Sequence, residues 1–296
     1  MMMIRLIGVL CLVGCSSSMV ARDKEPPQPR SCVIFDGETG DVLAWPTLLE
    51  RVARADAVML GERHDDQMGH LVQQAILEDA PTPLGLALEM LERDEQSLLD
   101  DFRDGLIDQT TFQELTESTN WAGLDTWGNY YQPAIDIVLR RGGKVVAANA
   151  PRRYVRHARI KGGGSLPSDQ PRSLWFDLPS SLDDSLYRKR FFDLMGEGTD
   201  PTVGDQFFLA QRIWDASMGK SLADLRASGA QPAVLLVGGF HVVEQGGTVL
   251  EYLHHRPSDE LLVVSLVPEQ KSFLPRDLLG KADIFILTGL HDEVGP

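Results

Sequence analysis

The sequence predicts an α/β fold in which a mostly parallel central sheet is flanked by helices. Three observations support this prediction: short apolar runs recur along the chain, helical patterns separate them, and most runs are continuously apolar and do not alternate. Continuous runs are typical of strands that are covered on both faces, and strands that alternate with helices favour parallel pairing. The 296 residues, 43% apolar and 24% charged, are typical of a globular protein.

Seven apolar runs rich in β-branched residues are the expected strands. They occupy residues 32–35, 57–60, 84–88, 144–148, 233–237, 261–267 and 282–287. We expect all of them to belong to a single domain over residues 31–296.

Two helices are expected between these strands. The segment 70–78 has a 3.6-residue apolar period, and either Asp65 or Asp66 is available as its N-cap. A second helix has Pro133 at its start and Gly142 after its last residue, the usual positions of these two residue types.

Two long segments, near residues 91–131 and 170–229, contain no expected strand. They are rich in helical or irregular patterns and carry several tryptophans and tyrosines. We expect them to form helical insertions over the carboxyl edge of the strands, where they would roof a cleft.

The net charge of −15 excludes two classes of partner. Nucleic-acid phosphates need a basic surface, and so does electrostatic binding to an anionic bilayer. We therefore expect no nucleic-acid partner, and contact with a membrane only through the N-terminus.

The N-terminus has the pattern of a targeting segment. One cation at Arg5 precedes an apolar run over residues 6–14, which is too short to span a bilayer as a helix. The run ends in Leu-Val-Gly-Cys15, which resembles the lipobox of bacterial lipoproteins, in which the cysteine is acylated and becomes the first mature residue. The alternative is an ordinary secretory signal, which would prefer an Ala-x-Ala cleavage site.

The lipobox resemblance divides the chain and locates it. Residues 1–15 would be the signal peptide, and the polar, proline-bearing residues 16–30 a flexible tether. Because the residue after Cys15 is Ser16 and not aspartate, the resemblance implies a periplasm-facing lipoprotein of the bacterial outer membrane. Cys32 would then be the single free thiol of the mature chain, so no intrachain disulfide is expected.

Two Gly-x-x-His motifs mark the expected functional site. His64 and His241 each follow directly after a predicted buried strand. Because ligands of open α/β sheets bind at the carboxyl edge of the strands, we expect both imidazoles to face one cleft. The alternative is a pair of helix-capping histidines in surface loops.

Three more polar residues lie at predicted strand ends. Glu62 and Glu89 can act as a base, orient a histidine or ligate a metal. The alternative is that each pairs with an arginine such as Arg63 or caps a helix. Asn149 is either a polar residue of the site at a fourth strand end or a turn residue before Pro151.

Two tyrosines are candidates for iron ligation, because a phenolate can ligate ferric haem. Tyr130 and Tyr131 precede a helix, where an aromatic pair also fits a core or lid role. Tyr154 and His157 lie on a helix with four arginines, which could bind haem propionates or another anion, or form a solvated basic face. Motifs of zinc fingers, zincin proteases and serine hydrolases are absent from the sequence.

Six sequence blocks together resemble the ChaN-like haem-binding lipoproteins of the Tiki superfamily. They are Gly61-Glu-Arg-His-Asp-Asp-Gln-Met-Gly-His70-Leu-Val-Gln73; Leu88-Glu-Met90 with Gln96 and Phe102-Arg-Asp-Gly105; Trp127 with Tyr131-Gln-Pro133; Val146-Ala-Ala-Asn-Ala-Pro-Arg152; Ala210-Gln-Arg-Ile-Trp-Asp-Ala-Ser-Met218; and Gly238-Gly-Phe-His241. The blocks keep the family order over about residues 50–245. One departure is Phe240, where we expect a smaller residue such as glycine, and its bulk would narrow the cleft.

The resemblance implies a non-enzymatic lipoprotein that takes part in haem or iron uptake and binds haem. Family members can bind haem in a dimer with tyrosine ligation, so a homodimer and an outer-membrane haem receptor are expected partners. Tyr131 is the first candidate for the axial ligand and Tyr154 the second, with Tyr130, His64, Glu89, Asn149 and His241 nearby.

The superfamily also implies a rival function. Its metal-dependent proteases and esterase-like enzymes use the same motifs, so Glu62, His64, Glu89 and His241 would be catalytic in a hydrolase. In that case His64, Glu89 and His241 would hold a divalent metal with an open water position.

Overall fold

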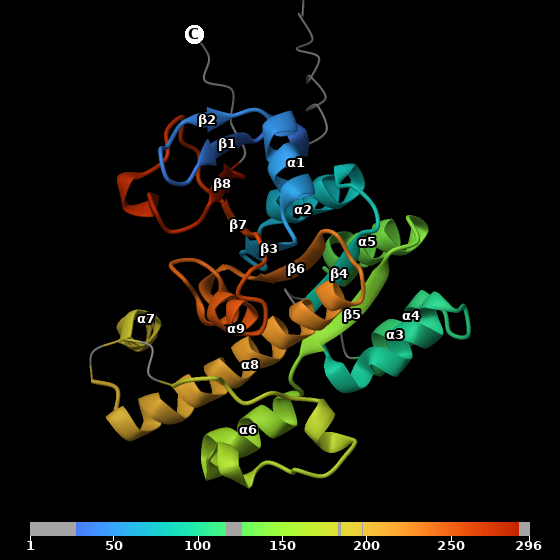
Figure 1. Ribbon diagram of the computed structural model, residues 1–296, viewed down its shortest axis with the longest axis vertical. Coiled ribbons are helices and arrows are strands. Elements are labelled where there is room, and N and C mark those ends of the chain that lie inside the picture. The colour runs from blue at the N-terminus through green and yellow to red at the C-terminus, as the bar shows by residue number, and fades with distance from the viewer. Residues whose placement is uncertain (1–27, 117–125, 183–184, 197, 290–296) are drawn as a thin grey trace, which may run out of the picture.

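The computed structural model describes residues 28–116, 126–182, 185–196 and 198–289, and it contains an eight-stranded sheet with helices on both faces (Figure 1). The strand order is β2-β1-β8-β7-β3-β6-β4-β5. The strands are β1 (Val33–Asp36), β2 (Val42–Leu43), β3 (Ala57–Glu62), β4 (Gly85–Glu92), β5 (Lys144–Asn149), β6 (Ala233–Gly238), β7 (Leu261–Val267) and β8 (Ile284–Leu287). Each of the seven expected apolar runs forms a strand, and the α/β class is confirmed.

The sheet is mixed, which corrects the prediction of a mostly parallel one. Strands β8, β7, β3, β6, β4 and β5 are parallel to one another, but β1 is antiparallel to both β8 and β2. Only a short turn separates Asp36 from Val42, and so short a connection can join only antiparallel strands. The two-residue strand β2 was not expected, because it is too short to produce a sequence pattern.

Two helical layers cover the sheet. Helices α1 (Trp45–Arg54), α2 (Gln67–Asp79) and α5 (Trp127–Arg140) pack on one face, and α8 (Pro201–Ala227) and α9 (Gly247–His255) on the other. Along β3, Val58 and Leu60 face the first layer while Ala57 and Met59 face the second. Burial of both faces explains why the strands are continuously apolar.

Helix α5 begins at Trp127, so Pro133 lies inside the helix and not at its start as predicted. A proline there removes the donor for the carbonyl of Asn129. The Gln74 side chain of α2 donates to that carbonyl at 3.0 Å, so a tertiary contact replaces the lost bond. Past the helix end, Gly142 takes a φ of +73°, a conformation that favours glycine, as expected.

Only part of the expected helical insertions lies over the carboxyl edge of the strands. The second half of α8 packs on the sheet through Met218 and Leu222. Its first half reaches the carboxyl edge, where Gln211 and Leu194 of α7 (Ser185–Met195) line a cleft. Helices α3 (Gln96–Arg103) and α4 (Gln109–Thr116) lie near β5, and α6 (Arg152–Lys161) lies beside α8 (Figure 1).

Strand β5 is an edge of the sheet, and one side chain covers part of it. Gln96 of α3 accepts a hydrogen bond from the Ala147 amide at 2.8 Å and donates to the Val145 carbonyl at 3.3 Å. Its amide therefore pairs with the strand as a neighbouring backbone would. Among the described residues, no helix is long and apolar enough to cross a membrane.

The helices that follow β3 and β6 lie on opposite faces of the sheet. After β3 the chain enters α2 on the first face, and after β6 it enters α9 on the second face. The two strands are parallel neighbours, with Glu62 opposite Gly238. A crevice is expected at such a topological switch point, outside the carboxyl ends of the strands.

Candidate functional site

The structure brings His64 and His241 into one cleft at this switch point. The cleft has a volume of ≈ 650 Å³ and is lined mainly by the residues that follow β3 and β6. Glu62 and Glu89 also line it. The four residues predicted at the strand ends therefore lie in one cleft. Each of its two histidines is paired with a carboxylate.

Glu62 is the centre of the first pair. Its carboxylate is buried and accepts hydrogen bonds from Tyr131 Oη at 2.8 Å and from Gln73 Nε2 at 2.6 Å. The Nδ1 of His64 lies 2.8 Å from Glu62 Oε1. A carboxylate only accepts, so Nδ1 of His64 carries a proton and Nε2 is the nitrogen available to the cleft.

The pKa values of this pair favour an ionised carboxylate beside a protonated imidazole. Burial alone would raise the pKa of Glu62, but the hydrogen bond from His64, the charges of His70 and His64 and the bond from Gln73 lower it. Burial opposes the charged form of His64, but the hydrogen bond to Glu62 and the charges of Glu89 and Glu62 outweigh it and raise its pKa.

Asp215 of α8 orients the second imidazole. Its Oδ1 lies 2.7 Å from Nδ1 of His241 and accepts the Thr248 hydroxyl at 2.9 Å. Gln211 Nε2 lies 3.2 Å from Nδ1 and 3.3 Å from Nε2 of the same ring, so it approaches both nitrogens about equally. Burial disfavours charge on His241, but the charges of Asp215 and Glu89 raise its pKa.

A buried arginine stabilises this second pair. Arg212 is 1% exposed, and its guanidinium lies 2.6 Å from Glu251 and 3.6 Å from Asp215 Oδ2. Glu251 and Asp215 are also buried. One cation therefore compensates two carboxylates beneath the cleft, and it holds Asp215 in place for His241.

Glu89 lies between the two imidazoles. Its Oε1 is 3.7 Å from His241 Nε2, and its Oε2 accepts the Gly238 amide at 2.6 Å. A Cβ at Gly238 would be 3.3 Å from His64 Nε2 and 3.5 Å from Glu89 Oε2, so both groups lie close to Gly238. Both histidines therefore lie close enough to Glu89 for its charge to contribute to the raised pKa of each.

Asn149 supports the site from outside the cleft. Its side chain donates to the backbone carbonyl of Glu89 at 3.0 Å and accepts the Ala150 amide at 2.9 Å. The β4–β5 register shifts between Leu88 and Glu92, so Asn149 fixes an irregular part of β4. The amide thus holds the backbone of Glu89 from the neighbouring strand.

This arrangement is suited to proton transfer, because carboxylates orient two imidazoles in one cleft. The metal interpretation has less support. In residues 28–116, 126–182, 185–196 and 198–289, no group of three His, Cys, Asp or Glu side chains is placed to hold a metal ion.

The candidate tyrosines lie in two different places. Tyr131 is fully buried beneath the cleft, and burial and the charge and hydrogen bond of Glu62 raise its pKa far above the ordinary value. Tyr130 stacks on His70 with ring centroids 4.1 Å apart. Tyr154 lies away from the cleft on α6, so the structure does not bring the three phenols together.

Tyr154 lines a separate pocket, which we call the α6 pocket. It has a volume of ≈ 430 Å³ and is lined by Arg153, Tyr154, His157, Ser165, Pro167 and Arg172. The Arg153 guanidinium lies 4.7 Å from the centre of the Tyr154 ring. The partly exposed phenol therefore lies among cationic side chains.

Phe240 packs largely away from the ligand space. Its ring contacts Tyr187 and Phe191 of α7, with centroids 5.4 and 6.4 Å away, and Arg190 lies 4.9 Å above it. It also lines the cleft. Its bulk therefore fastens α7 beside the cleft and only partly narrows it.

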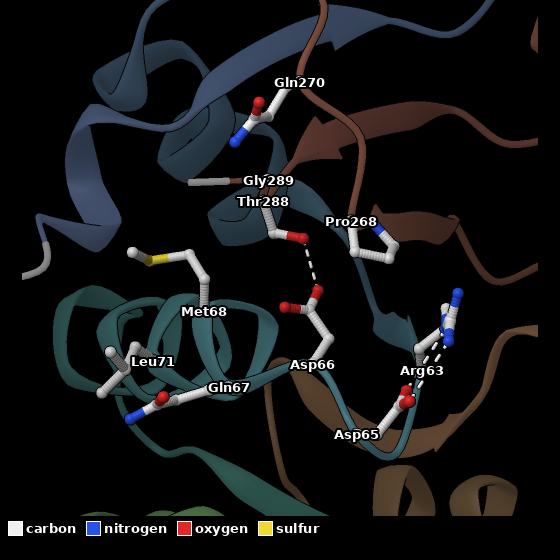
Figure 2. Close-up of a pocket in the computed structure, with 10 residues that line it drawn as sticks. All are labelled: Arg63, Asp65, Asp66, Gln67, Met68, Leu71, Pro268, Gln270, Thr288 and Gly289. Carbon is white, nitrogen blue, oxygen red and sulfur yellow. Dashed lines mark hydrogen bonds and ion pairs between the residues drawn. The ribbon is translucent and has the colours of Figure 1, made fainter. Parts of the chain in front are cut away.

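A neighbouring pocket shares the loop after β3. Figure 2 shows Asp66 accepting a hydrogen bond from Thr288, with Arg63 paired to Asp65 on the other side of the loop. Asp66 takes the N-cap position of α2 as predicted, but its carboxylate bonds Thr288 and not the helix amides. This pocket of ≈ 520 Å³ contains neither histidine.

Three residues that line or support these pockets were not singled out from the sequence. Asp215 and Gln211 are separated by four positions on α8, and polar residues at that spacing within a largely buried helix were the available signal. Arg172 lies in an irregular segment, and nothing in the sequence indicates that it lines the same pocket as Tyr154. Cys15 and residues 16–27 lie outside the described residues.

Comparison with known proteins supports the fold and identifies the family. The family model described as haem-binding uptake, Tiki superfamily, ChaN matches residues 48–252. The structure titled "Cofacial heme binding to ChaN of Campylobacter jejuni" is 21% identical, with a TM-score of 0.63 over 86% of this chain and 96% of that one.

Two other structures are more distantly similar. The type III effector HopBA1 is 14% identical with a TM-score of 0.47, over 89% of this chain and 99% of that one. A mutant erythromycin esterase, EreC, is 11% identical with a TM-score of 0.43, over 86% and 83%. No curated protein is significantly similar in sequence. Because the family model covers more than half of its length, the chain belongs to the ChaN haem-binding uptake family of the Tiki superfamily.

Proposed function

We propose that this protein binds haem at the α6 pocket as part of haem or iron uptake. Family membership supports haem as the ligand. The observation that supports the α6 pocket as the site is Tyr154, a partly exposed phenol beside Arg153, His157 and Arg172. A phenolate ligates ferric iron, and cationic side chains suit the carboxylates of haem.

The structure favours Tyr154 over Tyr131 as the axial ligand. Ligation by Tyr131 would expose a fully buried ring and remove the hydrogen bond that Glu62 accepts. It would also require ionisation of a phenol whose pKa is strongly raised by burial and by Glu62. Ligation by Tyr154 would not require a buried ring to become exposed, because Tyr154 already lines a pocket.

A haemin titration of the domain without residues 1–15 tests this function. We expect the wild-type protein to give a Soret shift and a ferric tyrosinate charge-transfer band. Tyr154→Phe should weaken haemin binding by about tenfold or more, because it removes the iron ligand. Tyr131→Phe, the matched control, should retain the band. Absence of a Soret shift in the wild type, or an unchanged titration with Tyr154→Phe, would contradict the proposal.

We also propose that a lipid on Cys15 anchors the protein to the outer membrane, facing the periplasm. The lipobox-like sequence before Cys15 supports this, and a homodimer or an outer-membrane haem receptor is the partner we expect. A Cys15→Ser variant should be lost from the outer-membrane fraction, because it has no thiol to carry the lipid. Retention with the outer membrane would show that the thiol is not the anchor.

A second candidate function is hydrolysis in the Gly-x-x-His cleft. The specific observation is that Glu62 and Asp215 each orient one imidazole, and that both imidazoles line the same cleft as Glu89. Such an arrangement can remove a proton from water and return one to a leaving group. It lies apart from the α6 pocket, so the two functions do not exclude each other.

A further inference from the structure

Two guanidinium groups meet at the α6 pocket from different segments. Arg153 belongs to α6, and Arg172 begins the short helix Arg172–Leu174. Burial opposes the charged form of Arg153, but Asp94 and, to a smaller extent, Tyr154 outweigh it and raise its pKa. The pKa of Arg172 is raised mainly by Asp169 and also by Tyr154. Both cations therefore lie within electrostatic reach of one phenol.

A carboxylate holds each guanidinium in place. Asp94 accepts a hydrogen bond from Nη2 of Arg153, and Asp169 accepts from Nε and Nη2 of Arg172 at 3.1 and 2.6 Å. Those bonds leave Nη1 of Arg172 outside its pair with Asp169. Each ion pair restrains a half-exposed arginine, so a ligand would lose less conformational entropy in binding it than in binding an unpaired arginine.

An aromatic and apolar surface adjoins the two cations. The ring of Tyr154 lies 6.0 Å from that of Trp175 and 5.3 Å from that of Phe176. The Arg153 guanidinium lies 5.5 Å from the centre of the Trp175 ring. In the same segment, Leu174 and Leu178 are 58% and 50% exposed. Aromatic and apolar surface beside two guanidinium groups suits an apolar ring that carries carboxylates.

We propose that Arg153 and Arg172 bind the two carboxylate side chains of the porphyrin. This inference rests on the proposed haem function and names the part of the ligand that the protein recognises. Of the four arginines that the sequence places on α6, only Arg153 lines the pocket. Arg172 supplies the second cation from outside the helix.

The test uses metal-free protoporphyrin IX and its dimethyl ester, followed by porphyrin fluorescence with the domain lacking residues 1–15. Each arginine is partly exposed, so each contact should contribute roughly threefold in affinity. We expect the wild type to prefer the diacid by about tenfold. Arg153→Gln and Arg172→Gln should each reduce that preference by about threefold. Arg156→Gln, the control on the same helix with the same charge change, should retain it.

The outcomes separate this inference from the haem function. A wild type without preference for the diacid, or a preference unchanged in both variants, overturns the inference even if haemin binds through Tyr154. A diacid preference that depends on the arginines supports the inference even if haemin gives no tyrosinate spectrum, a result that overturns only iron ligation. Circular dichroism of each variant confirms that it is folded.

Discussion

Arg212→Leu is expected to lower the free energy of unfolding by about 3–5 kcal/mol, the usual cost of removing one partner from a buried ion pair. Arg212 is the cation that lies against both Asp215 and Glu251, and all three are buried. Leucine fills much of the space but leaves two carboxylates without compensation. Urea denaturation monitored by tryptophan fluorescence measures the loss.

A surface pair provides the control for this prediction. Lys220→Ala breaks an exposed contact with Asp224 on the same helix and should change stability by less than about 1 kcal/mol. The double variant Arg212→Leu with Glu251→Leu should recover part of the loss, because it removes one of the stranded carboxylates. A loss below about 1 kcal/mol for Arg212→Leu would show that the network does not stabilise the fold.

His241→Asn is expected to reduce ester hydrolysis in the cleft by about 100-fold or more, if the cleft is catalytic. Asparagine keeps a polar group near Asp215 but cannot accept and return a proton at neutral pH. Hydrolysis of p-nitrophenyl acetate, with and without chelator, measures the activity and its dependence on a metal.

Matched variants make this second prediction specific to the cleft. Glu62→Gln should also reduce the rate, because it removes the carboxylate that fixes Nδ1 of His64. Tyr154→Phe should leave the rate unchanged, because Tyr154 lies in the separate α6 pocket. An absence of activity above buffer, or equal rates for wild type and His241→Asn, would remove hydrolysis as a candidate.

The sequence predicted the strands well because both faces of the sheet are buried. Runs such as 57–60 and 233–237 contain almost only apolar residues, and such composition is a local property that can be read directly. The predicted start of α5 was wrong because of a tertiary contact. Pro133 normally marks a helix start, but Gln74 from a different helix compensates its missing donor.

The site was predictable only where it follows the strands. His64, His241, Glu62 and Glu89 could be found because a parallel sheet collects its strand ends at one edge. Asp215 and Arg212 come from the opposite helical layer, and Arg172 from an irregular segment. Their placement depends on packing between elements distant in sequence, which no local pattern encodes.

The side chain of Gln96 has a consequence for how molecules meet one another. An open edge strand is a template on which a second chain can add and begin a fibre. The Val145 carbonyl and the Ala147 amide of β5 are already bonded to Gln96, so they cannot receive a foreign strand without first releasing it. One glutamine thereby protects the protein against aggregation through this edge at high local concentration.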